Sequence, residues 1–134
     1  MDSFIEEVLR IKAPATTMFR RATADIEIGG VLIPAGAIIE TRYGAANIDS
    51  EVFSNPEEVD LDRSNSKSLL TFGMGIHLCI GNQLARGEMR SAFKQLVDRM
   101  HNFRATRGED SYKYTANYTS YGLTELWMSF DRRD

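Results

Sequence analysis

The sequence predicts an α+β fold, and two kinds of apolar pattern lead to that class. Apolar residues recur at helical spacing near the N terminus and again over residues 82–100. Short runs elsewhere alternate apolar and polar residues, as strands do. No internal repeat, low-complexity tract or linker divides the 134 residues, so one structural unit is expected.

The first predicted element is a helix that begins near Ser3. Ser3 and Glu6 have the S-x-x-E spacing of a capping box. The helix should end before Pro14, because proline removes a backbone hydrogen bond. Its apolar residues at helical spacing are Phe4, Ile5, Val8 and Leu9.

A small antiparallel meander is predicted next. Residues 26–28 and 31–33 flank a Gly29–Gly30 turn, and a second turn at residues 34–36 leads to a third strand at about 37–43. No period holds from Gly44 to Thr71. A segment of that length is expected to be a functional loop.

The clearest predicted helix runs from Asn82 to about Met100. Its charged residues lie mainly off the apolar stripe, which consists of Leu84, Ala85, Met89, Ala92, Phe93, Leu96, Val97 and Met100. Two short strands are expected afterwards, at residues 112–116 and 123–130.

Charge and composition argue against several classes of protein. Sixteen basic and nineteen acidic residues leave a net charge of -3, which is not the electrostatic footprint of a nucleic-acid binder. The single cysteine excludes an internal disulfide, and the acidic start lacks the features of a signal peptide. No apolar run approaches the roughly 18 residues of a membrane span. We expect a cytoplasmic protein without nucleic-acid or membrane partners.

The stretch from Phe72 to Gly81, "FGMGIHLCIG", holds the only cysteine, Cys79. A lone cysteine is often an inert buried residue, so that interpretation stays open from the pattern alone. A nucleophile and base pair with His77 also stays open, although position suggests no orienting residue. The glycine spacing matches neither a dinucleotide loop nor a phosphate loop, and a zinc cluster of histidine and cysteine is missing from the sequence.

A thiolate that binds a metal in a large flat group is the remaining interpretation. Cys79 lies just before the predicted helix at Asn82, where the helix dipole favours negative charge. Gly73, Gly75 and Gly81 lack side chains, so the backbone can turn sharply and approach a planar macrocycle.

The residues Phe72, Gly73, Gly75, His77, Cys79 and Gly81 resemble the haem-ligand motif of the cytochrome P450 family, F-x-x-G-x-[HR]-x-C-x-G. Three other segments resemble the family in the same order along the chain. Glu7–Arg10 is similar to the E-x-x-R of the K helix, although alone it would be an ordinary i,i+3 surface pair. Residues 55–63 resemble the meander before the haem loop, and residues 83–88 resemble the start of the L helix.

The resemblance implies that Cys79 is the axial ligand of haem b, with His77 and Arg20 as partners of the propionates and Phe72 near the sulfur. Arg20 has an alternative role as a surface charge at a strand edge. Glu7 and Arg10 would be a buried structural pair. The residues implied to line the substrate site are Ala15, Thr16, Thr17, Met18, Phe19, Ser120, Tyr121 and Leu123.

The sequence departs from the family pattern at two places. The family's A-N-R-D is Ala46-Asn47-Ile48-Asp49 here, and an aromatic position of the meander is Val59. These departures leave open whether Arg63 or another residue is the third member of the network around Glu7 and Arg10.

The resemblance implies a monooxygenase that inserts one oxygen atom of O2 into a small apolar substrate, using electrons from a ferredoxin-type or other redox partner. It covers the last third of a family member, so residues 1–134 are expected to be one segment of a larger domain that needs the remainder of its chain or self-association. The alternative is a non-catalytic haem-binding or structural remnant. Four basic residues are either a docking patch for an acidic ferredoxin or a solvated helix face: Lys67, Arg86, Arg90 and Lys94.

Overall fold

Helix α1 (Asp2–Ile11) begins the chain in the computed structural model, which describes residues 1–133. Its end before Pro14 confirms the prediction. The predicted capping box is wrong, because Met1 is the N-cap residue and, within residues 1–133, no side chain makes a capping hydrogen bond at that end of the helix. Ser3 already lies inside the helix, and Glu6 is bound to Arg86 instead.

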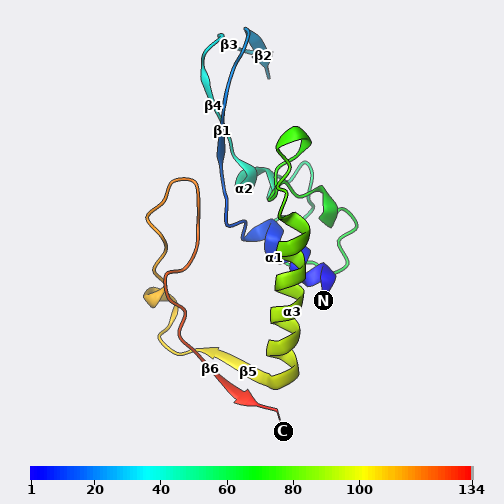
Figure 1. The fold of residues 1–134 in the computed structure, drawn as a ribbon, viewed down its shortest axis with the longest axis vertical. Coiled ribbons are helices and arrows are strands. Elements are labelled where there is room, and N and C mark those ends of the chain that lie inside the picture. The colour runs from blue at the N-terminus through cyan, green and yellow to red at the C-terminus, as the bar shows by residue number, and fades with distance from the viewer. Residues whose placement is uncertain (134) are drawn as a thin grey trace.

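Two separate antiparallel pairs follow α1 and form a projecting arm (Figure 1). β2 (Ile26–Ile28) pairs with β3 (Val31–Ile33), as predicted. The predicted third strand exists as β4 (Ile38–Thr41), but it pairs with β1 (Met18–Arg21) and not with β3. The meander prediction was therefore wrong in its last pairing. β1 contains two adjacent arginines and lacks the alternation that identifies strands in a sequence.

The segment after β4 is irregular, as predicted, apart from two short helical turns. These are α2 (Tyr43–Ala46) and a 3₁₀ helix at Ser66–Ser68. α2 begins inside the range predicted for the third strand. Although the segment has little regular structure, Asn47 and Phe53 are almost fully buried in it. The segment therefore packs against α1.

Helix α3 (Asn82–Arg99) closely matches its prediction. Only part of its apolar stripe is packed: Met89 and Phe93 contact the core formed by Ile5, Leu9 and Leu69. Four other stripe residues, Leu84, Ala92, Leu96 and Val97, are exposed, because the ten residues of α1 cover only a portion of the longer helix (Figure 1).

The last part of the chain forms β5 (Met100–Ala105), a 3₁₀ helix at Glu109–Ser111, and β6 (Met128–Arg132). β5 pairs with β6 in an antiparallel ribbon beyond the end of α3 (Figure 1). The strand predicted at residues 112–116 was wrong, since only one isolated bridge, Tyr114 to Leu123, forms there. The strand predicted at residues 123–130 begins only at Met128.

Within residues 1–133, no helix combines the length and apolar character that crossing a membrane requires.

Candidate functional site

The cysteine loop, which we define as residues 72–81, bends sharply at two glycines. Gly73 and Gly75 have φ values of +68° and +66°, in the left-handed region that side chains disfavour. A 3₁₀ helix at Gly75–His77 follows. The loop closes where the backbone N–H of Cys79 donates to the carbonyl oxygen of Phe72 at 2.9 Å. The glycine positions predicted from the motif therefore allow the bend that returns the chain to Cys79.

Cys79 is exposed, so the interpretation of this thiol as a buried core residue does not hold. Its carbonyl oxygen accepts hydrogen bonds from the backbone N–H of Asn82 at 3.2 Å and from the Asn82 side-chain amide at 2.6 Å. A Cβ placed on Gly81 would lie 3.8 Å from the Cys79 sulfur, at ordinary contact distance. The backbone of Cys79 is thus held by hydrogen bonds while its sulfur remains accessible.

Arg20 of β1 is connected to the cysteine loop through Tyr43. Its guanidinium donates to the carbonyl oxygen of Phe19 at 2.8 Å and to the hydroxyl of Tyr43 at 3.4 Å. The same hydroxyl lies 3.6 Å from the position of a Cβ added to Gly73. Arg20 therefore reaches the first bend of the loop through Tyr43. His77 is exposed at the other end of the bend.

Glu7 and Arg10 form a two-pronged ion pair in which both residues are 0% exposed. The distances from Arg10 Nε and Nη2 to the two carboxylate oxygens are 2.8 and 2.9 Å. Arg63, 56 positions from Glu7, adds a third charge through its Nε at 3.1 Å. Arg63 is thus the third member of the network, whose identity the sequence left open.

Hydrogen bonds keep the buried carboxylate of Glu7 ionised. Burial by itself raises the pKa of Glu7, but hydrogen bonds from Arg10, from the backbone N–H of Asp60 and from Arg63 outweigh burial and lower this pKa to about 2. Arg10 also donates to the carbonyl oxygens of Asn47 and Glu58, each at 3.0 Å. The network therefore ties α1 to the irregular segment before the cysteine loop.

Asn47 and Thr71 extend this connection directly to the loop. The Asn47 amide donates to Thr71 Oγ1 at 2.8 Å, and Thr71 Oγ1 donates to the carbonyl oxygen of Leu9 at 2.6 Å. The Asn47 side-chain oxygen accepts from the backbone N–H of Leu70 at 2.6 Å. Sequence reasoning compared Asn47 with a family motif but assigned no role to it or to Thr71, since single asparagines and threonines in an irregular segment resemble ordinary turn residues.

The two segments predicted to line a substrate site lie side by side. Ala15 and Ser120 form an isolated antiparallel bridge, and the N–H of Thr16 donates to the carbonyl oxygen of Thr119 at 3.0 Å. Thr17 is buried, and its hydroxyl contacts Glu40 at 3.0 Å and the carbonyl oxygen of Thr41 at 3.2 Å. The structure therefore brings the segments together but directs Thr17 toward β4.

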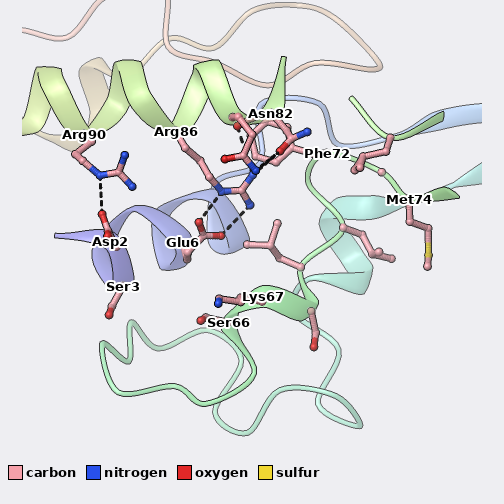
Figure 2. A pocket seen from close by; sticks show the side chains of 16 residues that line it. Asp2, Ser3, Glu6, Ser66, Lys67, Phe72, Met74, Asn82, Arg86 and Arg90 are labelled. Atoms are coloured by element: carbon pink, nitrogen blue, oxygen red, sulfur yellow. Dashed lines mark hydrogen bonds and ion pairs between the residues drawn. The ribbon is translucent and has the colours of Figure 1, made fainter. Parts of the chain in front are cut away.

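A groove of about 810 Å³ lies between α1, the residues 66–74 and the start of α3 (Figure 2). Three of the four basic residues considered from the sequence are already paired with acids: Arg86 with Glu6, Arg90 with Asp2 and Lys94 with Asp98. Lys67 lies on the opposite wall of the groove (Figure 2). The basic charge of this face is largely neutralised by the chain itself.

The family model described as Cytochrome P450 matches residues 1–115. The chain belongs to the cytochrome P450 family. Cytochrome P450 105A3 of Streptomyces carbophilus is 40% identical over 91% of this chain and 30% of its own length. Steroid C26-monooxygenase of Mycobacterium tuberculosis is 42% identical over 94% of this chain and 31% of its own length. The chain thus spans about a third of the length of these relatives.

Solved P450 structures share the fold over almost the whole chain. Substrate-free CYP109E1 from Bacillus megaterium superimposes with a TM-score of 0.92 at 32% identity, over 99% of this chain and 34% of that one. P450BioI in complex with an acyl carrier protein gives a TM-score of 0.90 at 35% identity, over 97% and 33%. The expected P450 fold is confirmed for this chain, which matches about a third of each of these structures.

Proposed function

We propose that this chain carries the haem-thiolate site of a cytochrome P450 monooxygenase, which inserts one oxygen atom of O2 into an organic substrate. The complete motif on a sharply bent loop, with the Cys79 thiol exposed, is the observation that carries the proposal. In this proposal, residues 1–134 are the C-terminal segment of a larger P450 domain. Two relatives named as oxygenases, for nocardicin C and for a steroid, support this reaction class.

The residues around the loop fit haem b. A Cβ added to Gly75 would meet nothing within 4 Å, so the bend presents open backbone on which a flat group can lie. The neighbouring side chains of Ile76 and Ile80 are almost completely exposed, which suits an apolar macrocycle better than water. Cys79 would ligate the iron, and Arg20 and His77 would bind the propionates.

The bound group would supply an iron centre that activates O2, and a thiolate ligand favours O–O cleavage, cytochrome P450s being the established example. The chain's own residues hold the ligand in place. The hydrogen bond from the Cys79 N–H to Phe72 and the two bonds that its carbonyl accepts from Asn82 fix the backbone on both sides of the sulfur. Phe72 and the three glycines of the loop would complete the surface against which the group lies.

The substrate in this proposal is a small apolar organic molecule. The paired segments at Ala15–Phe19 and Ser120–Leu123 would line its site, with Met18, Phe19 and Tyr121 as the exposed apolar side chains. A ferredoxin-type or other redox partner would supply electrons. The ion pairs of Arg90 and Lys94, whose side chains are more than half exposed, favour the solvated-face interpretation of these two residues over a bare basic docking patch.

The optical spectrum of the reduced, carbon-monoxide-bound protein tests the proposal. The expected result is the long-wavelength Soret band of a thiolate-ligated haem in the full-length protein. A Cys79→Ser variant should lose this band while retaining its secondary structure by circular dichroism. The proposal is refuted if the unaltered protein lacks the band or if the serine variant retains it.

A second candidate is that the 134 residues alone are a non-catalytic remnant. The exposure of Ile76, Ile80, Leu84 and other large apolar residues favours this candidate for the isolated chain, because such surface normally packs against another surface. Substrate turnover by the isolated chain, supplied with haem and a reducing system, distinguishes the two. We expect no turnover, and measurable turnover would exclude the remnant.

A further inference from the structure

Arg86 projects from the first part of α3 into the groove between α3 and α1 (Figure 2). Its guanidinium grips Glu6 of α1 with two bonds, from Nε at 2.6 Å and from Nη2 at 3.0 Å. The side chains are only 21% and 16% exposed. Bonding to Glu6 raises the pKa of Arg86, so this cation persists at every working pH. The pair therefore holds the guanidinium in one fixed position.

In that position, Arg86 contacts two residues that bond to the backbone of Cys79. Its Cζ lies 4.6 Å from the centre of the Phe72 ring, within cation–π distance. Phe72 in turn accepts the Cys79 N–H through its carbonyl oxygen at 2.9 Å. The guanidinium thus packs on the residue that closes the cysteine loop on its N–H side.

The second contact reaches the carbonyl side of Cys79. Arg86 Nη1 donates to the side-chain oxygen of Asn82 at 3.3 Å. The amide nitrogen of the same Asn82 side chain donates to the Cys79 carbonyl oxygen at 2.6 Å. Accepting a bond from Arg86 fixes which end of the Asn82 amide faces Cys79, because the oxygen must face the cation. Both backbone groups of Cys79 are therefore linked to one side chain.

We infer that Arg86 is a positioning residue that clamps the Cys79 backbone through Phe72 and Asn82, with Glu6 as its anchor, and thereby keeps the sulfur in its metal-binding geometry. This inference rests on the proposed function, since it assigns a role to the haem-thiolate site. It differs from the solvated or docking roles expected from sequence. Partners that orient a ligand residue affect metal affinity and the electron donation of the ligand.

Arg90 provides a matched control on the same face of α3. It lies four residues after Arg86 and also pairs with an acid of α1, Asp2, at 2.8 Å. That pair is much more exposed to solvent than the pair of Arg86 and Glu6, with side-chain exposures of 52% and 72%. Figure 2 shows Arg90 one turn farther from Phe72 and Asn82 than Arg86. An Arg90→Gln variant therefore removes a similar charge pair without touching the two links.

The experiment compares Arg86→Gln, Arg86→Lys and Arg90→Gln in the full-length protein. The first readout is hydrogen exchange at the Cys79 amide in the haem-free protein. We expect exchange about tenfold faster in Arg86→Gln, because the loop loses the contact on Phe72 and opens locally more often, and no change in Arg90→Gln. Arg86→Lys keeps the charge but lacks the planar fork, so it should also exchange faster than the unaltered protein.

The second readout is the Soret band of the reduced, carbon-monoxide-bound protein. A fraction of Arg86→Gln and Arg86→Lys should shift to the short-wavelength band of a neutral thiol ligand, while Arg90→Gln keeps the thiolate band. If Arg86→Gln does not fold, Arg86→Lys and Glu6→Gln carry the same test.

The outcomes separate the two proposals. An unaltered protein without the thiolate band refutes the proposed function. An unaltered protein with the band, together with Arg86 variants that match Arg90→Gln in both readouts, overturns the positioning role alone. Equal effects in the Arg86 and Arg90 variants also overturn it, because a general loss of helix packing would then account for both.

Discussion

The network around Glu7 and the cysteine loop are connected through Asn47 and Thr71, but the side chains of the first are buried and those of the second are mostly exposed. Glu7 and Arg10 are completely buried, and partners from three parts of the chain bond to their charges. In the cysteine loop, the side chains of Ile76 and Ile80 are almost fully exposed, and Cys79 is exposed as well. One region is complete within this chain, and the other presents its side chains outward.

The difference follows from the relative costs of an unpaired buried charge and of exposed apolar surface. A buried charge without a partner costs several kcal/mol, so the loss of one member of the network should strongly destabilise the fold. Exposed apolar side chains cost less free energy per residue, so the fold tolerates them even when no other surface covers them. The buried network is therefore a structural device, whereas the exposed loop has the properties of a binding surface.

The largest expected effect comes from removing the central charge of the network, the carboxylate of Glu7. Glu7→Gln should lower the free energy of unfolding by about 3–5 kcal/mol, because it leaves Arg10 and Arg63 buried without a counter-charge. Denaturant titration measures the change. The exposed Glu57 gives the control, since Glu57→Gln should change the free energy by less than about 0.5 kcal/mol. Similar losses in both variants would contradict the structural role of the network.

Acid should weaken the network without a mutation. The pKa of Glu7 is lowered in the folded state from 4.5 to about 2, so the ionised carboxylate stabilises the fold fully above about pH 4.5. This contribution, about 3 kcal/mol, is lost as the pH falls from 4.5 to 2. Urea titrations across this pH range should show the loss of unfolding free energy in the unaltered protein. The Glu7→Gln variant should show a smaller loss over the same range. An equal pH dependence of the unfolding free energy in both proteins would contradict this prediction.

Backbone geometry distinguishes the glycines of the loop from one another. Gly75→Ala should destabilise the haem-free protein by about 1 kcal/mol, because its φ of +66° is strained for a residue with a Cβ. Gly81→Ala should be milder, since a Cβ there meets only the Cys79 sulfur at 3.8 Å. Thermal unfolding of the two variants measures the difference. A reversed order would show that the bend at Gly75 does not control the loop.

The smallest expected effect on stability comes from the cysteine. Cys79→Ser should change the unfolding free energy of the haem-free protein by less than about 0.5 kcal/mol, because the thiol is exposed. The same change should abolish the thiolate Soret band of the loaded protein. Denaturant titration and the optical spectrum are measured on one preparation. A large loss of stability without haem would show that Cys79 belongs to the core after all.

Local patterns were enough to predict α1, α3, the β2–β3 hairpin and the motif that ends in Cys79, because each depends on residues close together in the sequence. The pairing of β1 with β4 and of β5 with β6 joins residues 17 to 32 positions apart, and neither β1 nor β5 has a strand-like period of its own.

The side-chain partners show the same division. The E-x-x-R spacing indicated the Glu7 and Arg10 pair, but only the folded chain brings Arg63 to Glu7 across 56 positions and Arg86 to Glu6 across 80. Arginines with these roles look like any charged residue in a helix or a turn. The sequence therefore specifies the exposed cysteine and the bend of its loop, while tertiary packing selects the charged partners around them, because burial and distance are properties of the folded state.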